Sequence, residues 1–372
     1  SERRFAGEET GLKQALVFPR NLSPADVSED EPWGLDFPFE GEDRRLAVIH
    51  ADGNGLGQVL HALSGLAGNY PEATARLYLG FSQALERATE SAAQGAYRET
   101  LKPAAVGENP ARIPARPLIL GGDDLTLIIR ADLALAFAAS FTRHFEEASR
   151  RELSAWRMSE SLAQFCAALP TALTLCTGIA YISANQPFSM AAHLAETLCQ
   201  HAKQTGQAVL EKGIGGSANR PKPSALAFHR VTTSLVDDDQ LDAPVRLGER
   251  DIRLSMGVWG IRAEDGLPTL STLLEFASKL GGQGMPRGPL RRLLTGLQQN
   301  PEAAREMWRR RKELFPDVVL AMDALLAALG EPDKDLPLVR AHHDGQWRTP
   351  LGDALDLIAV DGIKPMALRE TK

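Results

Sequence analysis

The sequence is poor in the features that define several large classes of protein. It holds three cysteines, Cys166, Cys176 and Cys199, without a CxxC pair, so neither a zinc module nor a disulfide framework is predicted. No apolar run approaches the roughly 18–20 residues of a membrane span, and the first residues lack the pattern of a signal peptide. We therefore expect a cytoplasmic protein. Because the chain begins with Ser1, we expect a processed product or part of a longer polypeptide.

Positive charge is also scarce. The 372 residues carry 41 Lys and Arg against 48 Asp and Glu, a formal net charge of −7, which argues against coating nucleic acid through the overall field. Residues 21–43 contain eight acids and no Lys or Arg, and we interpret 1–43 as an irregular acidic lead-in.

The exception is the segment 286–312, where eight bases stand against two acids. This basic segment predicts contact with RNA phosphates or with an acidic partner, although a solvated helix face explains the same run. Trp308 within it either stacks on a base or anchors its helix. The residues alone leave both pairs of alternatives open.

What is present predicts an α+β protein of about two domains. Apolar runs predict strands at 46–51, 117–120, 125–129, 173–182 and 225–231, and helical spacing predicts helices at 55–66, 72–98, 132–151 and 187–205. The four-residue connection 121–124 makes the central pair an antiparallel hairpin. This order is ferredoxin-like, with a mixed sheet and helices on one face.

After a strand-like stretch at 252–261, the pattern becomes helical. Helices are predicted at about 268–280, 289–299, 301–314, 316–330 and 350–360. We place one domain at 44–262 and a C-terminal all-α domain at 263–372.

Carboxylates fall at the ends of these predicted strands. Asp52 ends the first strand and Asp123 and Asp124 occupy the hairpin turn, so neighbouring strands would bring three repelling acids together. Oxygen-only ligands of this kind suit Mg²⁺ or Mn²⁺ bound together with phosphate. Glycines around them allow a close approach to phosphate and a tight turn, namely Gly53, Gly55 and Gly57 on one side and Gly121 and Gly122 on the other.

A resemblance becomes specific when these segments are read in order. They are LAVIHADGNGLG at 46–57, GGDD at 121–124, TGIA at 177–180, a helix with Ala195-Glu196 and Ala202-Lys203, and ALAFHR at 225–230. Over roughly 44–232 this order resembles the palm domain of the large subunit of type III CRISPR effectors, the Csm/Cmr family. That family is related to GGDEF and class III nucleotidyl cyclases, and its members join ATP into cyclic oligoadenylates in antiviral defence.

The resemblance implies roles for individual residues. Asp52 and Asp123, with the Gly53 carbonyl, would hold the metals, and Asp124 would complete the site and orient the attacking 3′-hydroxyl. Lys203 would reach the triphosphate of ATP from the end of its helix, or would merely complement the helix dipole as a solvated C-terminal lysine. The nucleotide-binding set it implies is Gly53, Asn54, Gly55, Gly57, Gly121, Gly122 and Lys203.

Several departures keep other functions open. Asn54 stands where many relatives carry a second acid, and the family's HD nuclease, Cys-rich zinc module and second palm have no counterpart here. His343-Asp344 is the single His-Asp doublet, which we interpret as a surface loop, so we expect no DNA cleavage. The alternatives are a non-catalytic nucleotide- or RNA-binding subunit of a ribonucleoprotein, or a GGDEF-like dinucleotide cyclase. A second palm, from a homodimer or another subunit, is the expected partner.

Overall fold

The computed structural model describes residues 44–360 apart from short stretches. The stretches left out are 70, 106–112, 160–169, 214–220, 233–243, 248–249, 264–265, 283–285, 335, 337 and 343–344. The predicted acidic lead-in and the His343-Asp344 doublet thus lie outside the described residues. In the described part, no helix is both long and apolar enough to cross a membrane.

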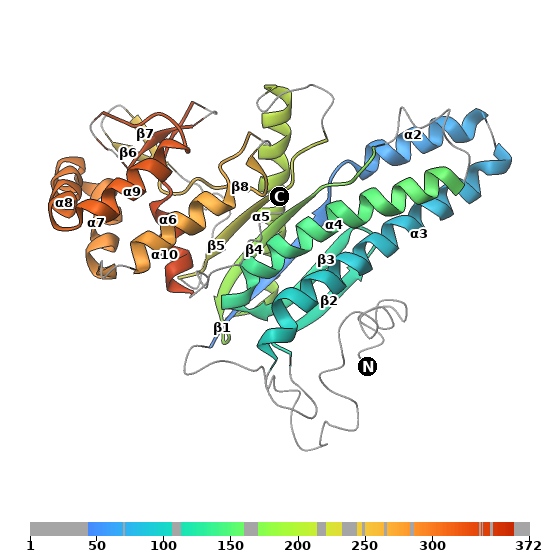
Figure 1. Ribbon diagram of the computed structural model, residues 1–372, viewed down its shortest axis with the longest axis horizontal. Helices are drawn as coiled ribbons and strands as arrows, with labels where there is room; N and C mark the ends of the chain where they lie inside the picture. The colour runs from blue at the N-terminus through green and yellow to red at the C-terminus, as the bar shows by residue number, and fades with distance from the viewer. Residues whose placement is uncertain are drawn as a thin grey trace, which may run out of the picture. The chain divides into compact units, whose positions relative to one another are not determined.

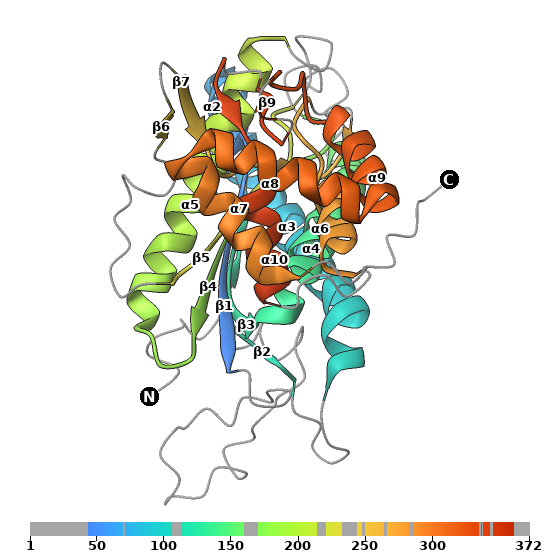
Figure 2. The same cartoon turned by 90° about the vertical axis from the view of Figure 1, so that its left-hand side faces the viewer.

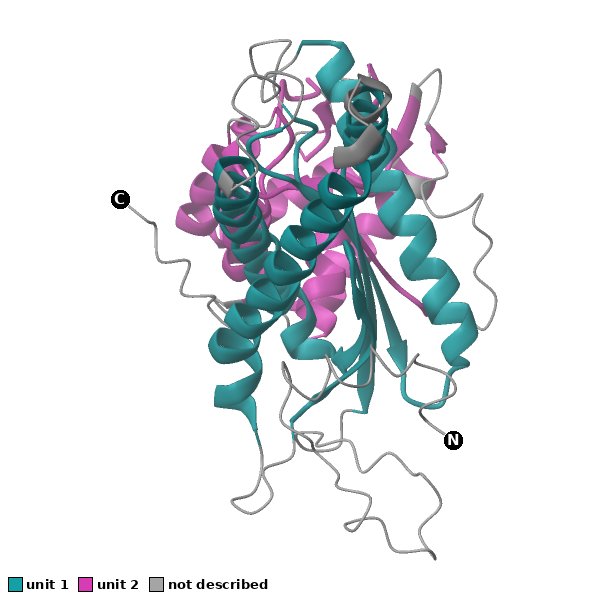
Figure 3. Ribbon diagram, turned by 90° about the vertical axis from the view of Figure 1, so that its right-hand side faces the viewer, with its two compact units in different colours: residues 1–227 teal, residues 228–372 magenta. Residues whose placement is uncertain are grey.

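The chain divides into two compact units, Ser1–Ala227 and Phe228–Lys372 (Figure 3). The domain bounds predicted from the sequence are 44–262 and 263–372. They differ from this division and stay a prediction. The elements of the first unit are β1 (Arg45–Gly53), α2 (Leu56–Asn69), α3 (Pro71–Ala96), β2 (Ala115–Gly121), β3 (Asp124–Arg130), α4 (Ala131–Ser159), β4 (Leu175–Ser183) and α5 (Phe188–Glu211) (Figure 1). A π-helical turn, η2 (Tyr97–Leu101), and a 3₁₀ turn, η3 (Lys102–Ala104), follow α3, and β5 (Ala225–Arg230) crosses the division.

The sheet of the first unit has the ferredoxin-like strand order that the sequence predicts. Its strands lie in the order β2-β3-β1-β4-β5, with β1 in the middle. β1 pairs antiparallel with both β3 and β4, and β2 pairs antiparallel with β3 as the predicted hairpin. The apolar run at the start of β1, with Ala47, Val48 and Ile49 fully buried, places this strand at the centre.

Helices cover both faces of this sheet rather than the single face predicted. α3 and α4 pack together, with α4 on β1, β3 and β4, whereas α5 packs on β4 and β1 from the opposite side (Figure 2). The reason lies in β4, where every residue from Leu175 to Ile182 is buried. A strand that is apolar on both faces needs cover on both.

The layer between α4 and the sheet is aromatic. Phe137, Phe141 and Phe145 recur every four residues on α4, are at most 1% exposed, and stack with ring centroids 6.2 and 6.3 Å apart. Such a ladder of buried rings stabilises the helix against the sheet. By packing on β1 and β3, α4 also holds in place the strand ends at which the acidic residues lie.

The second unit is mainly helical, as predicted, and also contains short strands. Its helices are α6 (Leu270–Gly282), α7 (Arg287–Gln299), α8 (Pro301–Leu314), α9 (Pro316–Ala327) and α10 (Leu351–Ala359), and its strands are β6 (Val245–Leu247), β7 (Arg250–Arg253), β8 (Trp259–Gly260), β9 (Arg340–Ala341) and β10 (Trp347–Arg348). A four-stranded mixed sheet has the order β6-β7-β10-β9. The region is therefore helical but not strictly all-α.

The single strand predicted at 252–261 is broken into β7 and β8. The buried carboxylate of Asp353 accepts hydrogen bonds from the Ser255 hydroxyl at 2.6 Å and from the Met256 N–H at 2.8 Å. Gly257 follows in the left-handed conformation, with φ of +81°. An acceptor from a distant helix thus takes the donors that a continuous strand would have used.

Candidate functional site

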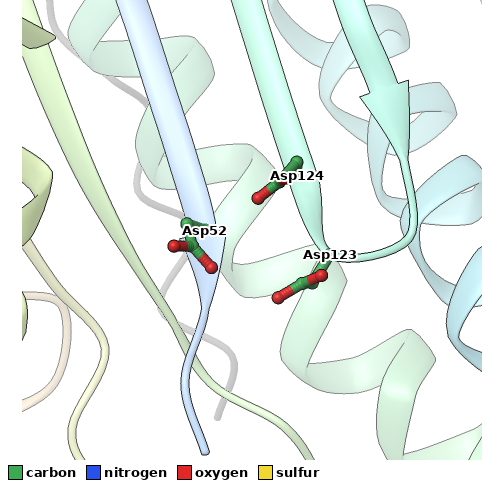
Figure 4. A group of neighbouring side chains, drawn as sticks. All are labelled: Asp52, Asp123 and Asp124. Atoms are coloured by element: carbon green, nitrogen blue, oxygen red, sulfur yellow. The ribbon is translucent and has the colours of Figure 1, made fainter. Parts of the chain in front are cut away.

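Three carboxylates converge at one end of the first unit's sheet. Asp52 is the last residue but one of β1, Asp123 lies in the β2–β3 turn, and Asp124 begins β3. The β1–β3 register pairs Ala51 with Leu125, so the next position along brings Asp52 beside Asp124. One oxygen of each carboxylate lies within 4.8 Å of the others (Figure 4). The acidic triad expected from the sequence is therefore present.

The triad carries a strong electrostatic penalty when no cation is bound. The pKa of Asp123 is raised to about 6, chiefly by burial and then by the charges of Asp124 and Asp52. Burial and the Asp52 charge also raise the pKa of Asp124, while His50 and Lys203 oppose the rise. A positive charge placed among the three would relieve this repulsion.

Lys203 supplies one such charge from α5. Its Nζ lies 2.5 Å from Oδ2 of Asp52 and donates a hydrogen bond to the Gly53 carbonyl at 3.1 Å. The helix continues to Glu211, well beyond the end at about 205 predicted from the sequence. Lys203 therefore lies inside α5, and the interpretation as a C-terminal lysine that complements the helix dipole is wrong.

Two glycines let the strand ends approach. A Cβ on Gly53 would lie 2.7 Å from Cβ of Asp123, closer than real contacts allow. Gly122 adopts φ of +60°, the left-handed conformation that turns the chain between β2 and β3. Both observations explain glycine at these positions by the geometry of the triad.

The Gly-rich segment after β1 divides into an inward and an outward part. The Asn54 side chain is 5% exposed, and its amide donates to Oγ1 of Thr174 at 3.1 Å and to the Pro223 carbonyl at 3.3 Å. The Asn54 N–H donates to the Thr174 carbonyl at 2.8 Å. In the structure, Asn54 thus ties β1 to the start of β4, and the predicted phosphate cradle is left with residues 55–57.

The outward part leaves room for a ligand. A Cβ added to Gly57 or to Gly121 would meet nothing within 4 Å, and Gly55 and Gly57 are exposed. Gly57 lies at the start of α2, before Gln58 and Val59, whose N–H groups donate to the Gly55 carbonyl at 3.0 and 3.1 Å. The N–H groups ahead of these two lie at the helix N-terminus, where donors lack an intrahelical acceptor. The start of α2 and the open space beside Gly121 adjoin the two chain segments that carry the carboxylates, the end of β1 and the β2–β3 turn.

The donor set fits a hard divalent cation. Asp52, Asp123 and Asp124 offer carboxylate oxygens, and the Gly53 carbonyl lies on the same side, as its contact with Lys203 shows. Oxygen ligands without nitrogen or sulfur suit Mg²⁺ or Mn²⁺. The identity of the metal stays part of the proposal below.

Thr89 is a contributor that the sequence analysis missed. It lies on α3 at 1% exposure, and its hydroxyl donates to the Gly122 carbonyl at 2.5 Å, with the Leu85 carbonyl one turn earlier at 3.1 Å. Because Gly122 precedes Asp123, this bond ties the turn that carries the carboxylates to the buried helix. The available signal was a lone hydroxyl on an alanine-rich buried helix face.

We expect Thr89→Val to loosen this turn while filling the same volume. The Gly122 carbonyl would lose its buried donor, which should lower the free energy of unfolding by about 1–2 kcal/mol and weaken Mn²⁺ binding, measured by isothermal titration calorimetry. Thr142→Val is the matched control, because Thr142 is buried on α4 and its hydroxyl donates one turn back along the same helix, to the Ala138 carbonyl at 2.9 Å. Equal Mn²⁺ affinities for the two variants would contradict the assignment.

The basic segment 286–312 forms α7 and most of α8 in the second unit. Trp308 is 5% exposed, so it anchors α8 rather than presenting its ring for stacking. Arg309 pairs with Glu306 at 2.5 Å and with Glu313 at 2.6 Å on the same helix. These ion pairs neutralise part of the positive charge that suggested a contact with nucleic acid. That contact stays a prediction.

Comparison with known proteins gives a family match within the first unit. Residues 45–209 match the family model described as Cas10/Cmr2, second palm domain. No curated protein matches the sequence.

Solved structures similar to the chain include Csm1 alone and Csm1–Csm4 assemblies. They include the Csm1–Csm4 cassette in complex with cA4 (14% identity, TM-score 0.41, covering 86% of this chain and 36% of that chain). Another is the same cassette with AMPPNP, at 16% identity and a TM-score of 0.40, covering 86% of this chain and 37% of that chain. A third is Csm1 in T. onnurineus, at 15% identity and a TM-score of 0.41, covering 86% of this chain and 38% of that chain. The chain therefore spans little more than a third of the length of these structures.

Proposed function

We propose that this chain provides a palm that binds ATP with Mg²⁺ or Mn²⁺ and transfers nucleotidyl groups to make cyclic oligoadenylates in a type III CRISPR-like defence system. The observation that carries the proposal is the triad, whose three carboxylate oxygens lie within 4.8 Å of one another. A purely structural domain gains nothing from holding three repelling acids together. The family match over 45–209 supports the same site.

The residues around the triad have separate tasks in this proposal. Asp52, Asp123 and the Gly53 carbonyl would hold the cation, which when bound offsets the negative charge of the phosphates and the leaving pyrophosphate. Asp124, beside Asp52, would accept a hydrogen bond from the attacking 3′-hydroxyl and so orient it. The N–H groups of residues 55–57 and the open space at Gly121 and Gly122 would receive the triphosphate.

The test is incubation of the pure protein with radiolabelled ATP or GTP and either Mg²⁺ or Mn²⁺, followed by separation of the products. Linked adenylates that form only with metal would support the proposal. Products from GTP alone would favour the GGDEF-like dinucleotide cyclase. Metal-dependent binding of ATP without any product, in every assembly tested, would favour a non-catalytic nucleotide-binding subunit.

A single palm makes assembly part of the proposal. Joining two nucleotides requires the 3′-hydroxyl of one within about 3–3.5 Å of the α-phosphorus of the other. The described residues contain one such acidic cluster, so we propose a second palm from an identical chain or another subunit.

We therefore expect activity per molecule to rise with protein concentration if the partner is a second copy. The measurement is the initial rate of product formation over a dilution series, with the mass of the protein followed by light scattering. If the partner is another subunit, activity should appear only when that subunit is added. Turnover that is independent of concentration in a demonstrated monomer would exclude the requirement.

A further inference from the structure

Lys203 makes two contacts that a bound cation would also make. Its ammonium group lies 2.5 Å from Oδ2 of Asp52 and 3.1 Å from the carbonyl oxygen of Gly53. A carboxylate oxygen and a backbone carbonyl oxygen are the hard ligands that Mg²⁺ and Mn²⁺ take in proteins. The ammonium group thus already occupies the acceptors assigned to the metal.

The fold holds Lys203 in this position. α5 packs so closely on β4 that a Cβ on Gly178 would lie 1.9 Å from the Ala195 carbonyl oxygen. Ala202, the residue before Lys203, is fully buried. Both side chains of the ion pair are mostly shielded, with exposures of 17% for Lys203 and 23% for Asp52. The contact between Lys203 and Gly53 joins residues 150 positions apart in the sequence, and the lysine lies on a helix whose position is fixed by close packing. It is therefore more than a chance surface contact.

We propose, on the basis of the function proposed above, that Lys203 is a resident counter-cation that competes with the divalent metal and is released to the phosphates when the metal binds. In the metal-free protein its charge offsets part of the repulsion within the triad. A metal that takes Asp52 and the Gly53 carbonyl displaces the ammonium group. The freed charge then lies beside the position of the triphosphate, so metal loading and nucleotide binding are coupled through one side chain.

The proposal makes two predictions of opposite sign for Lys203→Met, which keeps the aliphatic stem but removes the charge. Mn²⁺ alone should bind about tenfold more tightly, because it no longer competes with a partly buried cation. A non-hydrolysable ATP analogue in the presence of saturating Mn²⁺ should bind about tenfold more weakly, because a phosphate partner is lost. Isothermal titration calorimetry measures both affinities without turnover.

Thermal unfolding gives an independent readout. Metal-free Lys203→Met should unfold at a lower temperature than the parent, because the triad has lost its counter-ion, and Mn²⁺ should raise that temperature by more than in the parent. Lys212→Met is the matched control. Lys212 is exposed at the C-terminal cap of the same helix, nine positions or about 13 Å farther along, and its loss should change neither affinity by more than about twofold.

The outcomes separate this inference from the function on which it rests. If the parent binds no Mn²⁺, the proposed function and the inference are both overturned. If the parent binds Mn²⁺ but Lys203→Met binds it equally or more weakly, the inference alone fails and Lys203 is a structural partner of Asp52. Tighter Mn²⁺ binding together with weaker nucleotide binding, absent from Lys212→Met, supports the competition.

Discussion

Replacing Asp123 and Asp124 together by asparagine is expected to abolish nucleotidyl transfer and metal-dependent ATP binding. Asparagine keeps the shape of both side chains but removes two of the three charges that attract the cation. We expect a loss in rate of at least about 1,000-fold, measured as product formed from radiolabelled ATP. Mn²⁺ binding should be lost in parallel, which calorimetry can follow without turnover.

The same variant carries its own control for folding. The pKa of Asp123 is raised to about 6 because its charge is unfavourable in the folded protein. Removing that charge should therefore stabilise the metal-free protein at pH 7, by about 1 kcal/mol after allowance for solvent screening.

The difference in stability between the double variant and the parent should depend on pH. A carboxyl with a raised pKa binds its proton more readily in the folded state, so the parent gains stability as the pH falls through about 6. The double variant lacks this gain, and the two melting temperatures should approach each other at lower pH. A variant that melts lower than the parent at pH 7 and still converts ATP would show that the triad is misassigned.

Gly178→Ala is expected to lower the stability of the folded protein strongly. The added Cβ would lie 1.9 Å from the Ala195 carbonyl oxygen and 2.5 Å from the Cys199 nitrogen, both in the backbone of α5. Neither atom can rotate away, so the whole helix must shift from the sheet. We expect a loss of about 3 kcal/mol or more in the free energy of unfolding, measured by denaturant titration.

The consequence reaches the site because α5 carries Lys203. A shifted helix should weaken the contact of Lys203 with Asp52 and change Mn²⁺ affinity even where the variant stays folded. Gly65→Ala is the matched control, since the same methyl group on α2 meets nothing within 4 Å and should be neutral or stabilising through helix propensity. Similar stabilities for the two variants would show that α5 adapts to the added methyl group.

Local pattern was enough to predict most elements of the first unit. The apolar run at 46–51 ends at Asp52, and the turn GGDD joins two apolar runs, so both carboxylate positions follow from where the strands stop. The structure confirms the α+β class and the antiparallel hairpin. The main difference from the prediction is that helices cover both faces of the sheet. The continuous burial of β4 requires cover on both faces, and the structure shows that α5 provides it on the second face.

Only the tertiary structure decided which groups meet at those strand ends. Lys203 reaches Gly53 across 150 residues, Thr89 reaches the Gly122 carbonyl from another helix, and Asn54 turns inward to Thr174. A sequence specifies strands and helices through short-range periodicity, whereas contacts of this kind depend on strand order and on how closely helices pack. The three acids could therefore be identified from the sequence, whereas the ion pair between Lys203 and Asp52 could be identified only from the fold.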